Sequence, residues 1–429
     1  MDYVGRNLPP GIWPALSLRA NFLWTFAGNV VYAASQWGIL VLLAKVGSPT
    51  MVGRFALGLA ITAPVLMLTN LQLRAIQATD AKDEYGFGDY LGLRLLTSVL
   101  AMGVIAGIVV FGGYRDETAL MILFIGLAKG FESVSDAAYG LMQKHERMDW
   151  IAVYMMIKGP LSLGALFGLV WTTQSVAYGA LSIAFVWLVV LIFYDLRNTR
   201  RLASILPRFN RRFLLRLTQL SLPLGAVMML VSLSSNIPRY FLERVWGEQE
   251  LGYFAALAYL MLVGNTVVGA LGQSASPRLA KSYARQDRPA FLHLLLRLAA
   301  IGAILGGLGL TLALAFGQEI LTLLYRPDYA ERVPVFIWLM LVSAVSYVAS
   351  FLGYGMTAAR YFRVQLPLFT LVTGVLTAAC AVLIPSGGLL GAAQAMGIAA
   401  VVQLLGSVAI NGFAVRALSR ATTLEVSVQ

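Results

Sequence analysis

The chain has 429 residues, of which 59% are hydrophobic and only 12% are charged, and its mean hydropathy is +0.76. Soluble domains carry about 25% charged residues, so this composition excludes a soluble domain and predicts a membrane protein. The net charge of +12 would suit a nucleic-acid binder, but the basic residues stand in short segments between apolar runs. That placement indicates membrane topology and contact with anionic headgroups, and it predicts no nucleic-acid partner.

Twelve apolar runs are long enough to cross a bilayer. Backbone groups in lipid must pair within their own segment, so each run is expected to form a helix. The expected spans are residues 20–44, 52–74, 91–112, 118–142, 149–171, 175–196, 217–241, 251–275, 290–316, 333–357, 363–385 and 388–415. The sequence therefore predicts an all-α polytopic membrane protein with twelve transmembrane helices.

Basic residues concentrate in every second loop. The rich set comprises Arg6, Arg19, Lys82, Arg94, Lys144, Arg147, the arginines of residues 197–216, Arg278, Lys281, Arg285, Arg288, Arg360, Arg363, Arg416 and Arg420. The poor set comprises Lys45, Arg115, Arg244, Arg326 and Arg332. By the positive-inside rule the rich loops are cytoplasmic, so both termini are expected in the cytoplasm.

The longest rich loop, residues 197–216, divides the chain into an N-terminal lobe (1–196) and a C-terminal lobe (217–429). Residues 53–57 (GRFAL) are echoed 199 positions later by residues 252–256 (GYFAA), which indicates a duplicated unit. Six spans is an even number, so the two halves form a parallel repeat, with its axis along the membrane normal.

Within the 197–216 loop, apolar side chains recur at helical spacing among the arginines. They are Leu202, Ile205, Leu206, Phe209 and Phe213. This pattern predicts an amphipathic helix on the inner membrane surface, and the alternative is a solvated basic linker. Four G-x-x-x-G pairs, Gly103/Gly107, Gly164/Gly168, Gly302/Gly306 and Gly387/Gly391, predict close helix packing.

The fourth span carries a stripe of polar residues on one face. Its members are Lys129, Glu132, Ser133, Asp136, Gly140 and Gln143. An ionisable group costs about 2.5–3.5 kcal/mol at a helix centre, so it normally faces a partner or a wet cavity. Lys129 and Glu132 form either an ion pair that locks the bundle or part of a cation or substrate site.

Three readings of Asp136 follow from its place on this stripe. If Lys129 pairs with Glu132, Asp136 is left over and could carry H⁺ or Na⁺ during transport. Alternatively, Asp136 pairs with Lys129 while Glu132 stays protonated. In the third reading, all three groups form one static network without a role in coupling.

Other polar side chains suggest a central aqueous cavity. The candidates are Asn29, Tyr32 and Gln36 in the first span, Asn236 in the seventh and Tyr354 in the tenth, with the cations Arg54, Arg74, Lys158 and Arg239. The alternative for the polar stripes is hydrogen bonding between helices inside each bundle. Arg54 starts its span, so it could also snorkel to the membrane interface.

The sequence carries no motif of a known catalytic or cofactor site. It lacks a phosphate-binding loop, a zinc-peptidase motif and a paired Asp-x-Asp, and its external loops are short. Cys380 is the only cysteine, which excludes a disulfide framework and a cysteine metal site. We therefore expect no catalytic residue, no metal and no cofactor, and we expect that the protein is not an enzyme.

Residues 53–57 (GRFAL), 70–74 (NLQLR) and 78–80 (ATD) resemble the second-helix region of polysaccharide transporters. These are the Wzx-type O-antigen flippases of the multidrug/oligosaccharidyl-lipid/polysaccharide (MOP) exporter superfamily, and the likeness in length and span count covers the whole chain. The resemblance implies two six-helix lobes in a V around a central cavity, in a bacterial inner membrane. It also implies flipping of an undecaprenyl-diphosphate-linked oligosaccharide from the cytoplasmic to the periplasmic leaflet by alternating access.

The resemblance implies as partners the lipid-linked glycan, membrane lipids and other membrane proteins of glycan assembly. The chemistry agrees, because arginine is the best planar donor to phosphate oxygens. One alternative is a drug/cation antiporter of the same superfamily, which a cation-rich cavity disfavours. A membrane glycan polymerase is a further alternative, which the short external loops disfavour.

Overall fold

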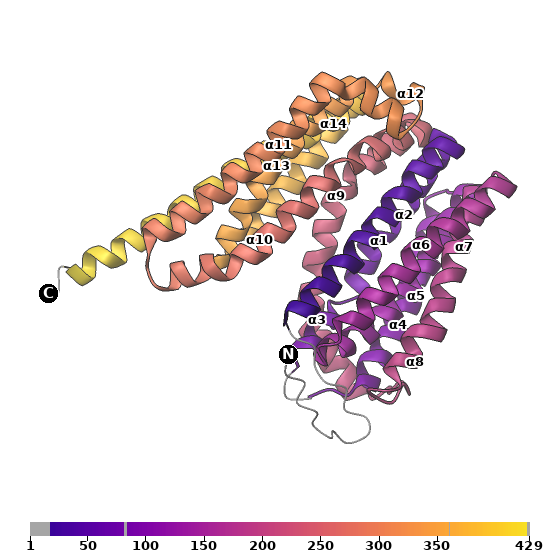
Figure 1. Ribbon diagram of the computed structural model, residues 1–429, viewed down its shortest axis with the longest axis horizontal. Helices are drawn as coiled ribbons and strands as arrows, with labels where there is room; N and C mark the ends of the chain where they lie inside the picture. The colour runs from indigo at the N-terminus through magenta and orange to yellow at the C-terminus, as the bar shows by residue number, and fades with distance from the viewer. Residues whose placement is uncertain (1–17, 81–83, 360, 427–429) are drawn as a thin grey trace, which may run out of the picture. The chain divides into compact units, whose positions relative to one another are not determined.

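The computed structural model describes residues 18–80, 84–359 and 361–426, and the regular structure in these ranges is helical throughout (Figure 1). The chain forms two compact units. Unit 1 contains residues 1–47 and 54–233, and unit 2 contains residues 48–53 and 234–429. The two units meet along the chain inside a helix, at residues 233 and 234, and the predicted lobe boundary at 197–216 stays a prediction.

Unit 1 is built around one long helix, α5 (Asp116–Lys144). The other elements are α1 (Leu18–Val46), α2 (Pro49–Thr69), α3 (Leu73–Thr79), α4 (Phe87–Phe111), α6 (Met148–Thr173), α7 (Val176–Val190), the π-helix η1 (Leu191–Asp195), α8 (Leu196–Thr199) and the start of α9 (Arg211–Tyr259). Helix α5 packs against α3, α4, α7 and η1, while α1 packs along α6. Asp116 and Glu117 in its first turn and Lys144 in its last complement the helix dipole.

Unit 2 has α13 (Val333–Ala358) between two long neighbours (Figure 1). Its other elements are the rest of α9, α10 (Met261–Ala284), α11 (Arg288–Leu324), α12 (Pro327–Ala330) and α14 (Phe362–Val426). Helix α13 packs against α10, α11 and α14. The core between α10, α11 and α13 includes Leu279, Phe291 and Phe351, all fully buried.

The described residues contain ten helical segments that are long and apolar enough to cross a membrane. Two of them, Arg211–Ala284 and Val364–Arg416, have room for two spans each. Both are interrupted by a glycine with positive φ, Gly247 at 82° and Gly388 at 53°, where the helix cannot continue. Counting both halves confirms the predicted all-α fold with twelve spans, and the protein is a multi-pass membrane protein.

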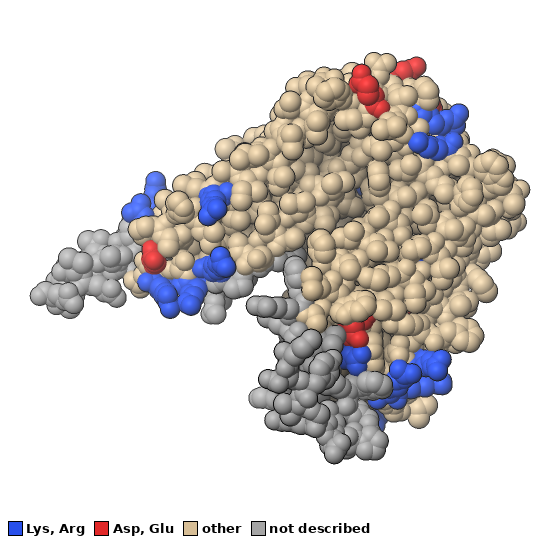
Figure 2. Space-filling model, viewed as in Figure 1, with Lys and Arg blue, Asp and Glu red and all other residues tan. Residues whose placement is uncertain are grey.

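On the surface, charged side chains lie toward the ends of the helices. On the face shown in Figure 2, Lys, Arg, Asp and Glu gather at helix ends, and the surface between these ends within each unit is uncharged. This is the pattern of a membrane-spanning surface. Among the residues of the predicted basic loops, Arg6, Lys82 and Arg360 lie outside the described ranges, as do both ends of the chain.

The predicted surface helix in the 197–216 loop is wrong, because residues 204–210 are not helical. The Arg208 backbone N–H instead donates to the Gly88 carbonyl at 2.8 Å, which ties the segment to the start of α4. Ile205 packs on the cluster of Phe87, Leu91 and Leu141, while Leu206 and Phe209 remain exposed. Tertiary contacts with α4 and α5 therefore override the helical periodicity of this loop.

The predicted second span also ends early. Helix α2 stops at Thr69, and Leu71 and Gln72 adopt left-handed backbone angles, with φ of 53° and 51°. The chain turns there and continues as the separate helix α3, which carries Arg74. This turn places residues 70–79 against α5.

The four G-x-x-x-G pairs differ in whether their glycines lie against another part of the chain. Gly302 and Gly306 of α11 lie against Tyr347 and Ala344 of α13, which confirms close packing for that pair. The pairs Gly103/Gly107 and Gly164/Gly168 have no described atom within 4 Å of an added Cβ, so their packing prediction is wrong. Gly391 faces the carbonyl of Leu383, while Gly387 faces open space. The motif alone does not distinguish a helix face that packs from one that is open.

The duplicated glycines make a reciprocal contact within unit 2. A Cβ added at Gly53 would overlap the backbone carbonyl of Glu248, and a Cβ added at Gly252 would overlap the backbone carbonyl of Pro49. Residues 49 and 248 are 199 positions apart, as are residues 53 and 252. The same contact is therefore made twice, with the two repeats exchanging roles.

We expect Gly53→Ala and Gly252→Ala each to destabilise the protein by about 1–3 kcal/mol, because a rigid backbone carbonyl occupies the space that the methyl group needs. Thermal unfolding of the purified protein can be followed with a thiol-reactive dye, because Cys380 is buried and is the only cysteine. Gly164→Ala is the matched control and should leave the unfolding temperature unchanged or raised. Equal effects of Gly53→Ala and Gly164→Ala would show that the reciprocal contact is loose.

Candidate functional site

The polar stripe of α5 is the best-developed polar site within unit 1. Neighbouring helices supply partners along its length. Tyr32 of α1 and Lys158 of α6 reach Glu132, while Arg94 of α4 and Arg74 of α3 reach Asp136. Farther along, the Arg74 Nε donates to Gln143 at 3.0 Å. The polar stripe of α5 and these partners thus form a continuous line of charged and polar side chains, which we call the α5 seam.

Glu132 is the centre of what we call the cation cluster, Lys129, Glu132 and Lys158. The Lys129 Nζ lies 2.7 Å from Glu132 Oε2, which confirms the pair expected from the i, i+3 spacing. The Lys158 ammonium pairs with Glu132 Oε1, and the Tyr32 hydroxyl donates to the same oxygen at 3.3 Å. One carboxylate therefore serves two lysines, and the cluster keeps one net positive charge.

Aromatic rings surround the cation cluster. The Lys158 Nζ lies 3.4 Å from the centre of the Trp187 ring and 5.2 Å from the centres of the Tyr32 and Tyr154 rings. Lys129 also faces Trp187, at 5.1 Å. The faces of these rings are electron-rich and stabilise an ammonium ion that is removed from water. Lys158 is 1% exposed, so it adds positive charge to the cluster from the interior of unit 1.

Asp136 has two arginine partners, so the prediction that it lacks a partner is wrong. Its Oδ2 accepts from the Arg94 guanidinium at 2.9 Å, and its Oδ1 lies 3.6 Å from the Arg74 guanidinium. Arg94 also donates to Asn70 Oδ1 at 2.6 Å, and Ser133 donates to the same amide oxygen at 2.8 Å. The alternative pairing of Asp136 with Lys129 is also wrong, because Lys129 binds Glu132.

The assignment of Arg94 to a cytoplasmic loop is a further error of the sequence reading. Its side chain is 0% exposed and lies inside α4, seven residues from the helix start. The signal that could have found it is a lone arginine within an apolar run, which requires a buried partner. The partner, Asp136, lies on another helix, so no local spacing reveals the pair.

The seam carries a surplus of positive charge. Four cations, Lys129, Lys158, Arg74 and Arg94, meet two carboxylates, Glu132 and Asp136. The side chains of Lys129 and Arg74 are 31% and 30% exposed, whereas Lys158 and Arg94 are buried. Two accessible cations backed by two buried ones form a site that attracts an anion.

The structure does not bring every predicted residue of unit 1 to this seam. Arg54 forms an ion pair with Glu117, twelve residues before Lys129 on α5, which is about 18 Å along the helix. The Glu117 carboxylate also accepts from the Ser175 hydroxyl at 2.6 Å. Asn29 is exposed on α1, and Gln36 is half-buried with its side-chain nitrogen unpaired among the described residues.

In unit 2 the predicted residues form two separate local arrangements. The Arg239 guanidinium donates to Asn236 Oδ1 at 2.8 Å and forms no salt bridge with any described carboxylate. The Tyr354 hydroxyl donates to the Gly269 carbonyl of α10 at 3.4 Å. Tyr354 therefore packs two helices together, while Arg239 keeps an uncompensated charge.

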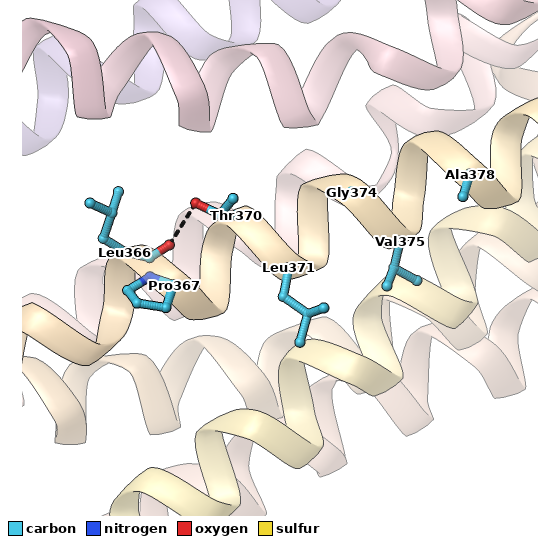
Figure 3. Close-up of a pocket in the computed structure, with 7 residues that line it drawn as sticks. All are labelled: Leu366, Pro367, Thr370, Leu371, Gly374, Val375 and Ala378. Carbon is cyan, nitrogen blue, oxygen red and sulfur yellow. Dashed lines mark hydrogen bonds between the residues drawn. The ribbon is translucent and has the colours of Figure 1, made fainter.

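Unit 2 has an apolar groove of about 750 Å³ along α14 (Figure 3). It is lined by Leu366, Pro367, Thr370, Leu371, Gly374, Val375 and Ala378. Its one hydroxyl, on Thr370, donates to the Leu366 carbonyl of the same helix at 2.9 Å (Figure 3). A groove without a free polar group cannot select a charged headgroup, so the α5 seam is the candidate site.

Known proteins resemble the chain over most of its length. A capsular polysaccharide biosynthesis protein, CapF of Staphylococcus aureus, is 27% identical over 392 residues, which make up 90% of this chain and 97% of CapF. The lipid II flippase MurJ in an inward closed conformation matches with a TM-score of 0.67 at 12% identity, over 91% of this chain and 86% of MurJ. An inward-facing MATE-family multidrug resistance transporter of the MOP superfamily gives a TM-score of 0.65 at 12% identity, over 92% of this chain and 99% of the transporter.

The two structural likenesses concern the fold alone, since their sequence identity is low. The sequence family described as polysaccharide biosynthesis protein matches residues 18–283, which is more than half of the chain. This match includes the segments at 53–57 and 70–74 that carry the resemblance to polysaccharide transporters. The chain therefore belongs to the polysaccharide biosynthesis protein family.

Proposed function

We propose that the protein is a flippase that moves an undecaprenyl-diphosphate-linked oligosaccharide from the cytoplasmic to the periplasmic leaflet of a bacterial inner membrane. The observation that carries this proposal is the positive surplus of the α5 seam, where Lys129 and Arg74 are accessible. A diphosphate is the charged part of such a substrate, and it must cross an apolar slab. Cations that replace its lost hydration lower the cost of that crossing.

Each part of the seam has a distinct role in this proposal. Arg74 offers a planar fork to two phosphate oxygens, and Lys129 offers a point charge. Glu132 and Asp136 hold these two cations in place without cancelling the charge of the seam. Tyr32 supplies a hydroxyl beside Glu132, and the buried Lys158 adds positive potential. Asn29, Gln36, Arg54, Asn236, Arg239 and Tyr354 lie outside the seam, and their part in binding the glycan stays a prediction from the sequence.

The names of the relatives support a lipid-linked glycan as the substrate class. CapF is named for capsular polysaccharide biosynthesis, and MurJ is named as a flippase of lipid II. The proposed mechanism is alternating access, with the lipid tail remaining in the bilayer. A drug/cation antiporter fits less well, because the accessible cations of the seam would repel a cationic drug.

The proposal is tested by flipping in proteoliposomes with a fluorescent undecaprenyl-diphosphate oligosaccharide. We expect Lys129→Gln to reduce headgroup affinity about 10- to 100-fold, the value of one charge-assisted hydrogen bond of about 1.5–3 kcal/mol. Lys45→Gln, at an exposed position in the last turn of α1, is the matched control and should flip at the wild-type rate. Wild-type protein that expels a cationic dye but moves no lipid-linked glycan would instead support the antiporter.

The proposed orientation places the 197–216 loop in the cytoplasm and the turn near Gly388 outside. In a Cys380→Ala background, Ser204→Cys and Ser386→Cys offer exposed labelling sites on these two segments. We expect an impermeant thiol reagent outside intact spheroplasts to label Ser386→Cys and not Ser204→Cys. Labelling of both, or of Ser204→Cys alone, would contradict the proposed topology.

A further inference from the structure

Asp195 is a carboxylate buried in unit 1 that the proposed function does not use. It ends the π-helix η1, and it is 0% exposed. Its Oδ2 accepts from the Ser135 hydroxyl at 2.6 Å and from the Tyr139 hydroxyl at 3.5 Å. Its Oδ1 is buried and has no hydrogen-bond partner among the described residues.

Asp195 has no direct cationic partner within the described part of the chain, and the charge of Lys158 acts on it only through space. Asp195 forms no salt bridge there, and its hydrogen bonds come from neutral hydroxyls. Removing an ionised carboxylate from water costs several kcal/mol unless a cation accompanies it. The arrangement therefore favours a positive charge at the free oxygen.

The surroundings of Asp195 supply oxygen ligands from two helices. Ser135 and Tyr139 come from α5, and Tyr154 comes from α6. The Tyr154 hydroxyl is buried and, like Asp195 Oδ1, lacks a hydrogen-bond partner among the described residues. Two unpaired buried oxygens beside two hydroxyls form a donor set for a small hard cation.

Helices α8 and α6 and the π-helix η1 also place polar or charged groups near Asp195. From α8, Thr199 donates to the Asp195 backbone carbonyl at 2.7 Å, and within η1 the Tyr194 hydroxyl donates to the Trp150 carbonyl at 3.0 Å. The charged group of α6 that acts on Asp195 electrostatically is Lys158, which is already paired with Glu132.

We propose that Asp195, Ser135, Tyr139 and Tyr154 bind one small monovalent cation, H⁺ or Na⁺, and that this cation controls the affinity of the cation cluster for an anion. The second half of this proposal rests on the proposed function. The first half, the binding of a cation, rests on the buried oxygens alone.

Tyr154 connects the two sites. Its ring lies 5.2 Å from the Lys158 ammonium on one side and 4.8 Å from the Tyr139 ring on the other. Lys129 and Lys158 balance Glu132 and Asp195 when the cation site is empty, so the net charge of these four groups is zero. A bound cation leaves a net charge of +1, which strengthens anion binding, and linkage requires the anion to strengthen cation binding equally.

The cation site is tested by the thermal unfolding temperature of the purified full chain. A cation that binds the folded state raises this temperature as its concentration increases. One arm varies Na⁺ against choline at constant pH, and the other varies pH without Na⁺. We expect one of these arms to raise the unfolding temperature of the wild type, and we expect Asp195→Asn to abolish that response.

Asp149→Asn is the matched control, because Asp149 pairs with Arg147 and is not one of the proposed cation ligands. It should keep the wild-type cation response. If Asp195→Asn does not fold, Tyr154→Phe, which removes one oxygen ligand, should weaken the response. The site is overturned if the unfolding temperature of the wild type responds to neither Na⁺ nor pH. It is also overturned if Asp195→Asn keeps the wild-type response, or if Tyr154→Phe, used when Asp195→Asn does not fold, leaves that response unchanged.

The control of anion affinity is tested with farnesyl diphosphate as the probe. We expect its affinity for the wild type to rise with the same cation, and its affinity for Asp195→Asn to be high and independent of that cation. A cation response of the unfolding temperature without any binding of farnesyl diphosphate would uphold the site and contradict the proposed function. Diphosphate binding that ignores the cation in the wild type would overturn the control of affinity.

Discussion

Replacing Glu132 by Gln is expected to lower the free energy of unfolding by about 3–5 kcal/mol, the usual cost of removing one partner from a buried ion pair. Lys158 is 1% exposed and would lose the carboxylate with which it pairs. Lys129 would also lose its partner, and the two ammonium groups would repel each other near the Trp187 ring. The loss is measured as a fall in the thermal unfolding temperature of the purified protein.

A second substitution separates charge imbalance from simple loss of packing. Lys158→Met removes the stranded ammonium and keeps a side chain of similar length. We expect the double variant Glu132→Gln/Lys158→Met to recover most of the stability lost in Glu132→Gln, because an apolar replacement of a buried pair is often neutral. If the two losses simply add, the pair is not an energetic unit.

Replacing Asp136 by Ala is expected to cost a similar amount, about 3–5 kcal/mol, since it strands the fully buried Arg94. Asn70 would remain as the partner of Arg94, but an amide oxygen does not neutralise a guanidinium. Asp136→Asn keeps hydrogen bonding and should lose less stability. The measurement is again the unfolding temperature, with Glu146→Ala, outside the seam at the end of α5, as the control.

The same variants test whether Asp136 couples transport to an ion gradient. Since Asp136 is bound to two arginines, we expect gradient-dependent flipping to persist in whatever Asp136→Asn protein folds. Loss of gradient dependence in Asp136→Asn, with its stability intact, would return Asp136 to the coupling role that the sequence first suggested.

Local periodicity predicted what lies on one helix, and it failed where the partner lies on another. The 100° pattern of α5 correctly placed Lys129, Glu132 and Asp136 on one face, and it identified one ion pair. Arg94 and Lys158 reach the same face from α4 and α6, and no spacing within a single span encodes that meeting. Pairing between helices depends on packing angle and rotation, which a single sequence does not specify.

The errors at the ends of elements have a related physical cause. Span lengths follow from apolar runs, but α2 ends at a turn formed by Leu71 and Gln72, whose side chains carry no turn signal. In the 204–210 segment, helical spacing yielded to a backbone hydrogen bond between Arg208 and Gly88. Asp195, like Arg94, is a lone charged residue in an apolar run, which indicates a buried site, but its neighbours Ser135 and Tyr139 lie on another helix and no local spacing reveals them.

The reciprocal contact between Gly53 and Gly252 has a consequence for how such a gene can evolve. After a duplication, the two copies are usually free to diverge, and a loss in one leaves the other intact. Here each glycine makes room for the backbone of the opposite copy, at Glu248 and at Pro49. A side chain larger than hydrogen at either glycine would therefore overlap the backbone of the other copy. Selection must consequently keep glycine at both positions.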